Sequence, residues 1–470
     1  MEVMLLVFVA GYVCIAMEHK IQVDKAAVAL VMAGIMWAVL ILTIPVTAAG
    51  INPDSFREFL AHNPSIQTLS YFEQCQRFIV DFKLIEYLGD ISSTLFFLIG
   101  AMTIVELIDV HKGFDIITDK ITSTNKRKLL WLISGITFLM SAVLDNLTTS
   151  IVMVMLLKKL IPNYKERWIF GSMIIIAANS GGAWSPIGDV TTIMLWIKGK
   201  ISSWPLISGI ILPSIVSVVV PLILASGLLK GELKKSNSAE TKKQDTAVLS
   251  RKGRKIILLM GVAGLLSVPV FKYLTGLPPF IGVMTALGCI WIYTEILYSR
   301  NTIRDFHMNR VTNVIKRVDT ATILFFLGIL LSVMSLEASG ALNKAGAFLN
   351  ENVKNVYLID VSIGILSAIV DNVPLVAVAM GMYPLADPAA LAIAADPAYL
   401  ANFVQDGTFW QFLAYCSGVG GSLLIIGSAA GVVVMGLEKI SFSWYLKHFS
   451  LLALAGYLAG AGVYYLIKVL

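Results

Sequence analysis

Two short segments of the sequence, 226 positions apart, place an Asp-Asn pair inside a long apolar stretch. They read Ser141-Ala-Val-Leu-Asp-Asn-Leu147 and Ser367-Ala-Ile-Val-Asp-Asn-Val373. An ionised carboxylate inside a bilayer costs at least ~2.5 kcal/mol, so two of them in matching places indicate function rather than packing. Asp145, Asn146, Asp371 and Asn372 are therefore the first candidates for an ion site, and the duplication predicts a transporter built from two halves.

A third polar segment lies in the middle of the apolar run 167–198 and reads Asn179-Ser-Gly-Gly-Ala-Trp-Ser-Pro-Ile-Gly-Asp189-Val-Thr-Thr192. Its glycines and Pro186 predict an unwound helix, which is tolerated in a bilayer only where protein or water satisfies the backbone. Freed carbonyls, carboxylates and hydroxyls are the hard oxygen ligands that a small cation prefers. The run 410–437 is similar but carries no acid. The candidate ligands of these two runs are Asn179, Ser180, Asp189, Thr191, Thr192, Ser417, Gly418, Gly420, Gly421, Ser422, Gly427 and Ser428.

The buried carboxylates suggest how such a site could work. Burial disfavours the charged form of a carboxylate, so a proton and a sodium ion can compete for the same oxygen. That competition is sufficient for exchange, because the carrier crosses loaded with either ion and the empty charged site does not cross. We expect Na+ in the region of Asp145, Asp189 and Asp371, with Asp145 as the ligand shared with the proton. The alternative for each acid is a structural hydrogen bond to a helix end.

The composition places these residues in a membrane. The chain has 470 residues, of which 57% are hydrophobic and 14% charged, and its mean hydropathy is +0.80. A soluble protein of this length is far less apolar, so the sequence predicts an all-α polytopic membrane protein. Apolar runs of spanning length lie at 2–17, 23–47, 91–110, 167–198, 206–229, 256–275, 278–297, 320–338, 410–437 and 449–469.

Charge in the connections predicts the orientation. Basic residues mark cytoplasmic loops, and 230–255 is rich in them, whereas 385–409 contains acids and no Lys or Arg. The stretch 129–157 has basic residues at both ends, so both ends are expected on the cytoplasmic side and the stretch is expected to be a re-entrant hairpin tipped by Asp145. The stretch 357–384 has Asp360 and Asp387 around it and enters from the outside.

Each half then contains five transmembrane helices and one hairpin, and the odd number of spans inverts the second half relative to the first. The sequence predicts two inverted repeats, the architecture of secondary transporters. The repeats are 1–229 and 256–470, joined by the basic cytoplasmic linker 230–255, and both termini are expected outside. The first repeat contains the hairpin 129–157 and the unwound helix 167–198. The second repeat contains the hairpin 357–384 and the unwound helix 410–437.

Several classes of protein are disfavoured. No Lys or Arg lies in the middle of a helix that carries an unwound segment or a hairpin tip, so an anionic substrate lacks an obvious partner. The five histidines sit in loops or at span ends, which supports neither a catalytic triad nor a zinc site. No signature of nucleic-acid binding or of a cofactor is present. The chain is expected not to be an enzyme, although an intramembrane aspartyl protease would also need two buried Asp residues.

At these motifs the sequence resembles the NhaD-type Na+/H+ antiporters, members of the ion transporter superfamily that also holds citrate, dicarboxylate, sulfate and arsenite carriers. The resemblance rests on the segments 141–149, 179–192, 371–375 and 420–431. It implies a dimer in the inner membrane, with a fixed scaffold and a moving transport unit that works as an elevator. It also implies a functional polar set made of Asp145, Asn146, Thr148, Asn179, Asp189, Thr191, Thr192, Ser367, Asp371 and Asn372.

The sequence and the resemblance together favour exchange of Na+ or Li+ for H+ across the lipid bilayer. The superfamily's anion carriers resemble Ser-Asn-Thr at the hairpin tips, where this chain has Asp145 and Asp371. A carboxylate in place of a hydroxyl favours a transported cation. The alternative is a Na+-coupled symporter of citrate, dicarboxylate or an arsenite-type anion, in which the carboxylates bind only the driving sodium.

Overall fold

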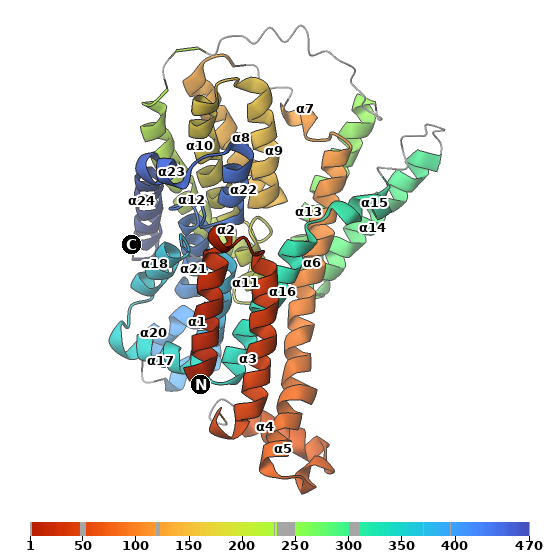
Figure 1. Ribbon diagram of the computed structural model, residues 1–470, viewed down its shortest axis with the longest axis vertical. Helices are drawn as coiled ribbons and strands as arrows, with labels where there is room; N and C mark the ends of the chain where they lie inside the picture. Colours follow the sequence, from red (N-terminus) through yellow and green to blue (C-terminus); the bar gives the residue numbers. More distant parts are fainter. Residues whose placement is uncertain are drawn as a thin grey trace. The chain divides into compact units, whose positions relative to one another are not determined.

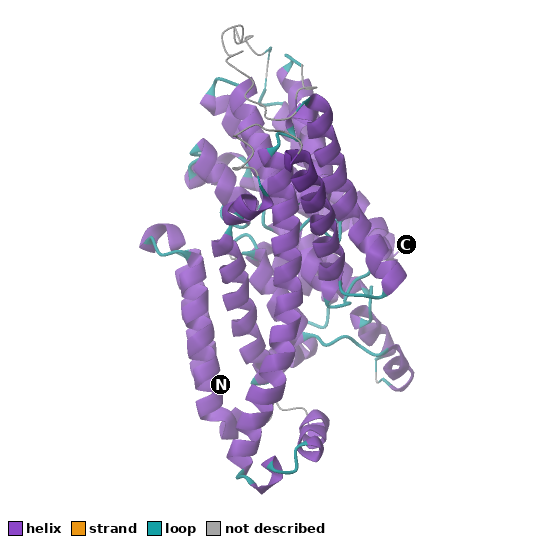
Figure 2. Cartoon of the chain, turned by 90° about the vertical axis from the view of Figure 1, so that its right-hand side faces the viewer, coloured by secondary structure: helices purple, strands orange, loops and turns teal. Residues whose placement is uncertain are grey.

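The computed structural model describes residues 2–47, 53–118, 123–229, 231–232, 250–299, 310–369, 371–394 and 396–469. Within these ranges the regular structure is helical, apart from one isolated bridge between Asn125 and Glu232 (Figures 1 and 2). Most of the predicted linker 230–255, and residues 300–309 of the connection 298–319, lie outside the described ranges.

Eight of the described helical segments are long and apolar enough to cross a membrane. They are α3 (Lys25–Thr47), the continuous run through α5 (Tyr71–Arg77), η3 (Phe78–Lys83) and α6 (Leu84–Val110), α8 (Lys126–Leu144), α12 (Ser203–Ser226), α13 (Arg251–Thr275), α14 (Pro279–Ser299), α16 (Thr320–Ala338) and α24 (Ser450–Val469). Their outer faces are apolar: Leu42 on α3 is 75% exposed and Leu451 on α24 is 72% exposed. Such faces suit lipid, and the protein is an integral, polytopic membrane protein.

The segments that carry the motifs are consecutive pairs of helices, and α8 is also one of the eight spanning segments. The first predicted hairpin is α8 and α9 (Asn146–Leu160), which are separated at Asp145, and the second is α18 (Val356–Leu366) and α19 (Asn372–Met382). The two predicted unwound helices are α10 (Tyr164–Ala183) with α11 (Val190–Ile197), and α21 (Thr408–Gly420) with α22 (Ala429–Glu438). The remaining helices of the described residues include α1 (Glu2–Ala16), α2 (Glu18–Ile21), α4 (Pro53–His62), α7 (Asp115–Thr118), α15 (Val311–Val314), α17 (Ala341–Asn352), α20 (Pro397–Leu400) and α23 (Phe442–His448).

The chain divides into two compact units, and each contains segments from both predicted repeats. Unit 1 consists of Met1–Leu95, Asp319–Ile359 and Val373–Val404. Its helices α3 and α16 pack closely, because Gly328 lies against the backbone of Ala29. The indole nitrogen of Trp37 also donates to the carbonyl of Leu331, at 3.0 Å.

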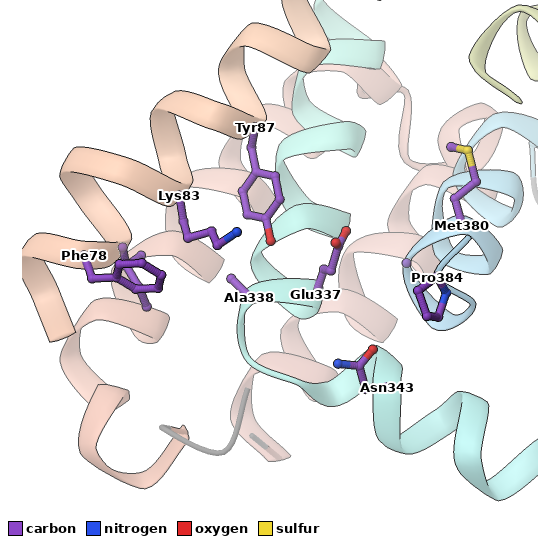
Figure 3. A pocket seen from close by; sticks show the side chains of 10 residues that line it. Phe78, Lys83, Tyr87, Glu337, Ala338, Asn343, Met380 and Pro384 are labelled. Atoms are coloured by element: carbon purple, nitrogen blue, oxygen red, sulfur yellow. The ribbon is translucent and has the colours of Figure 1, made fainter. Parts of the chain in front are cut away.

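Unit 1 contains a polar pocket of about 260 Å³ (Figure 3). Lys83 reaches it from the end of η3, Tyr87 from the first turn of α6, and Glu337 from the end of α16. Lys83 also pairs with Glu86 at 2.8 Å. The lining of this pocket includes none of the predicted site residues.

Unit 2 consists of Phe96–Val318, Asp360–Asn372 and Gln405–Leu470. Helix α10 lies at its centre and packs against α8, α9, α12, α21 and α22 (Figure 1). The end of α22 is tied to the beginning of α10, because Arg167 pairs with the fully buried Glu438 at 2.7 Å. The indole of Trp168 also donates to the Glu438 carbonyl, at 2.9 Å.

The two hairpins meet the two broken helices through matching contacts. The Ser141 hydroxyl of α8 donates to the carbonyl of Ala178 on α10, at 2.5 Å. In the second half, the Ser367 hydroxyl donates to the carbonyl of Ser417 on α21, at 2.9 Å. The hairpin residues are 226 positions apart and their acceptors 239 positions apart, the same two offsets that relate the sequence motifs.

Glycines allow these helices to touch, again in matching positions. A β-carbon on Gly181 of α10 would overlap the carbonyl oxygen of Phe138 on α8. A β-carbon on Gly420 of α21 would overlap the carbonyl oxygen of Gly364 on α18. The glycines of the motifs therefore serve close backbone approach as well as unwinding.

Substitution of Gly181 by Ala is expected to destabilise the protein by about 1–3 kcal/mol, because the added methyl group meets backbone that cannot rotate away. Gly462→Ala is the matched control, since Gly462 is also helical and has no neighbouring atom within 4 Å of the new methyl group. That control is expected to gain up to about 1 kcal/mol from helix propensity. Thermal unfolding of the purified protein in detergent measures both, and equal melting temperatures for the two variants would contradict the contact.

Candidate ion-binding site

The tip of the first hairpin has an unusual backbone. Asp145, between α8 and α9, adopts φ 82° and ψ 160°, a region that is essentially restricted to glycine. Its carboxylate caps α9 and accepts hydrogen bonds from the Thr148 backbone N–H at 2.7 Å and from the Thr148 hydroxyl at 2.9 Å. A non-glycine residue in this conformation costs about 1–3 kcal/mol, and such strain gathers at functional sites.

Asp189 lies in the break between α10 and α11, and it is almost completely buried. One carboxylate oxygen accepts hydrogen bonds from the backbone N–H and the hydroxyl of Thr191, both at 2.8 Å. The other accepts from the side-chain amide of Asn146, at 2.6 Å. The amide of Asn372, from the second hairpin, approaches both oxygens at 3.4–3.5 Å. Asp189 thus joins residues of both hairpins.

Asn179, in the last turns of α10, links the two halves of the site. Its side-chain oxygen accepts from the amide of Asn146, at 3.1 Å. Its side-chain nitrogen donates to the hydroxyls of Ser422 and Ser428, both at 2.9 Å. We use the name polar cluster for the hydrogen-bonded set made of Asn146, Asn179, Asp189, Asn372, Ser422 and Ser428.

Four helices begin at this place: α9, α11, α19 and α22. A helix N-terminus carries a partial positive charge and stabilises an anion. Asp145 caps α9 and Asp189 caps α11, so two of the four ends already have a carboxylate of the protein. Ser428, a neutral residue, caps α22.

The other predicted site residues lie in different roles. Thr148 contacts Asp145, and the Thr192 hydroxyl donates to the backbone carbonyl of Asp189 at 2.8 Å. Ser367 is outside the polar cluster, because its hydroxyl is used in the contact with α21. Asp371, half-buried, directly precedes Asn372, whose amide approaches Asp189.

The three carboxylates do not converge on one point. Among the described residues, no group of three or more Asp, Glu, His or Cys side chains is placed to hold a metal ion. A sodium ion in this region would therefore take a carboxylate together with amide, hydroxyl and backbone oxygens. Those are the ligands that the polar cluster supplies.

Two positioning residues were not predicted from the sequence. The Ser185 hydroxyl donates to the Ala142 carbonyl at 2.5 Å and fixes the hairpin against the break in α10–α11. The Tyr445 hydroxyl of α23 donates to the Ser422 carbonyl at 2.7 Å. Ser185 lies within the polar motif and could have been included, whereas nothing in the sequence around Tyr445 relates it to Ser422.

Known proteins match this chain along nearly its whole length. A model of the citrate transporter family, CitMHS, matches residues 12–404. Sodium/proton antiporter 2 of Arabidopsis thaliana is 42% identical over 461 residues, 98% of each chain. Sodium/proton antiporter 1 of the same plant is 42% identical over 98% of this chain and 71% of its own length. The Na(+)/H(+) antiporter NhaD of Vibrio cholerae is 28% identical over 94% of this chain and 87% of its own.

The two Asp-Asn motifs and the two broken helices thus occur in a chain that matches sodium/proton antiporters over 98% of its own length. The chain belongs to the NhaD-type Na+/H+ antiporter family, within the ion transporter superfamily that includes the citrate transporters.

Proposed function

We propose that this protein exchanges Na+ or Li+ for H+ across the membrane by alternating access. One observation carries the proposal: the buried Asp189 carboxylate is surrounded by amide and hydroxyl groups, and no Lys or Arg lies in the middle of the helices that supply these groups. A buried carboxylate without a cationic partner is costly unless a cation or a proton neutralises it. The chemistry of the site therefore supports binding of either Na+ or H+.

The exchange follows from charge. When Na+ or a proton neutralises each ionised carboxylate, the site is neutral and can move within the membrane. The empty, charged site cannot, because moving an uncompensated carboxylate through the bilayer is unfavourable. We propose Asp145, Asp189 and Asp371 as the exchanging carboxylates, with Asn146, Thr148, Asn179, Thr191, Thr192, Asn372, Ser422 and Ser428 as supporting groups. Ser367 is proposed to hold the second hairpin in place.

The architecture that we propose has two inverted repeats, 1–229 and 256–470. The matching contacts made by Ser141 and Ser367 support this division. The hairpins and broken helices form the moving part of an elevator, and the rest forms a scaffold in a homodimer. We place the protein in the inner membrane with the loop 230–255 in the cytoplasm and both termini outside, as the loop charges favour.

A Na+-coupled anion symporter is the second candidate. It is favoured by the four helix N-termini at the site and by the citrate-transporter family match. Against it, carboxylates cap α9 and α11, where an anionic substrate would otherwise be stabilised. A negative group at those ends repels a second anion, so we favour the cation exchanger.

The test uses the full-length protein in proteoliposomes with a pH dye and an acid interior. External Na+ or Li+ is expected to drive proton efflux, and Asp145→Asn is expected to reduce its rate by at least ~10-fold, since one charge-assisted ligand is worth about 1.5–3 kcal/mol. Asp319→Asn is the control, because exposed Asp319 makes the same two contacts with Thr322 that Asp145 makes with Thr148. If no cation drives proton efflux and Na+ drives uptake of labelled citrate, the proposed cation exchange is wrong and the protein is an anion symporter.

A further inference from the structure

Asp360 is a buried carboxylate that the proposed exchange site does not use. It lies on α18, the first arm of the second hairpin, where the sequence suggested an outward-facing acid. The structure buries it completely. Among the described residues, no group donates a hydrogen bond to either of its carboxylate oxygens.

In the part of the chain that the structure describes, no cationic side chain is bonded to Asp360. One turn further along α18, Gly364 lies against the Tyr457 hydroxyl of α24 and the Cys416 carbonyl of α21. The titratable side chains of these two helices beside this turn are Tyr457, whose hydroxyl donates to the Val361 carbonyl at 3.0 Å, and Cys416. Both are neutral groups at neutral pH in a buried place, so neither compensates a negative charge.

The first half of the protein has a buried hydroxyl, and no acid, at the equivalent place. At the hairpin offset of 226 positions, Asp360 corresponds to Ser134 and Gly364 to Phe138; at the broken-helix offset of 239 positions, Cys416 corresponds to Ala177. Phe138 and Ala177 belong to a hydrophobic core cluster with Val218. The same arrangement of helices is thus built without an acid in one half, and packing alone does not explain Asp360.

We propose that Asp360 is a second proton-binding site, separate from the polar cluster, and that it takes up and releases its proton during the transport cycle. The step is a simple protonation: H+ adds to a carboxylate oxygen to give the neutral acid, and leaves from that oxygen to water. A proton needs a single oxygen, whereas Na+ needs several hard oxygen ligands that a thiol and a phenol do not provide. The role of this proton in the transport cycle rests on the proposed Na+/H+ exchange, whereas proton binding by Asp360 does not.

The position of Asp360 suits this role. It is six residues before the end of α18, about 9 Å along the helix axis, and the same hairpin carries Asp371 at its tip. A proton on Asp360 is therefore held on the same hairpin as a carboxylate of the exchange site. Uptake of this proton in addition to the one at the polar cluster would raise the number of protons moved for each Na+.

The first experiment measures protonation directly, by infrared spectroscopy of the purified full-length protein during a pH titration in H2O and D2O. The wild type is expected to show the C=O stretch of a carboxylic acid that decreases as pH rises and is missing in Asp360→Asn. Exposed Asp387 supplies the control, since Asp387→Asn should leave the band unchanged. A spectrum that is identical in wild type and Asp360→Asn overturns the proposal, and so does a band that never responds to pH in the folded protein.

The second experiment measures the ratio of protons to Na+ in proteoliposomes, from the imposed pH gradient that just balances a Na+ gradient. Asp360→Asn is expected to lower the ratio by one proton; an unchanged ratio overturns the role in the cycle. Asp360→Ser is a second variant, in case Asp360→Asn does not fold, because Ser134 occupies the equivalent position in the first half. If both variants fold but exchange no ions, the transport cycle requires the proton on Asp360, which supports the proposal. If the wild type exchanges no cation, the proposed function fails, while the infrared result still decides whether Asp360 binds a proton.

Discussion

Asp189→Asn is expected to abolish Na+-dependent proton efflux, with a fall of at least ~100-fold. The Asp189 carboxylate accepts from Thr191 on one oxygen and from Asn146 on the other, and it is the acid at the centre of the polar cluster. An Asn retains one acceptor but cannot carry the charge that attracts either ion. Loss of a buried charged partner costs about 3 kcal/mol or more, which corresponds to the expected factor.

The measurement is the initial rate of dye-reported proton efflux at several Na+ concentrations. Exposed Asp387 is a matched control, because its carboxylate also accepts from the backbone N–H two residues later, that of Ala389, at 2.9 Å. Asp387→Asn is expected to transport at the wild-type rate. Unchanged Na+ affinity in Asp189→Asn would mean that Asp189 is not a ligand of the cation. Asp145 or Asp371 would then supply the negative charge.

Asn179→Ala is expected to lower both the stability and the apparent Na+ affinity. The Asn179 side chain joins Asn146 to Ser422 and Ser428 inside a fully buried region. Its removal leaves these three groups without their shared partner, and each buried polar group left unsatisfied costs about 1–3 kcal/mol. The neighbouring side chains can partly rearrange, which lowers the total cost. We therefore expect a loss of about 2–4 kcal/mol in the free energy of unfolding.

Ser172→Ala is the control for this variant. Ser172 lies on the same helix and is equally buried, but its hydroxyl donates only to the carbonyl of Trp168 in the preceding turn, at 2.8 Å. Thermal unfolding in detergent and Na+ titration of proton efflux are measured for both variants. Equal effects of Asn179→Ala and Ser172→Ala would mean that the network across the halves contributes nothing to the site.

Much of the helical arrangement was accessible from the sequence. The apolar runs correspond closely to the observed helices: the run 320–338 is α16, and the run 206–229 is largely α12. A bilayer leaves few choices for a backbone, because every N–H and C=O must be satisfied within the segment. The interruptions at Asp145 and between Trp184 and Asp189 also lie where polar residues, glycine and proline interrupt apolar runs.

The sequence did not predict which contacts each polar residue makes. The sequence favoured Asp145 as the ligand shared by Na+ and the proton, and this choice stays a prediction. The structure adds that the amide of Asn146, next to Asp145, donates to Asp189. Ser367 belongs to the same motif as Asp371, but its hydroxyl is directed to α21. The spacing of residues along the chain does not determine which other helix a given side chain contacts.

By itself, the sequence determined the class of protein, the positions of most helices and of their breaks, and the residues that we propose for the site. These depend on local properties: apolar length, glycine and proline content, and the cost of a charge in lipid. Only the tertiary structure decided that Asn179 links both halves, that Tyr445 holds the Ser422 carbonyl, and that Asp360 is buried without a hydrogen-bond donor among the described residues. Those facts depend on contacts between segments up to about 250 positions apart, and no local property of a chain encodes them.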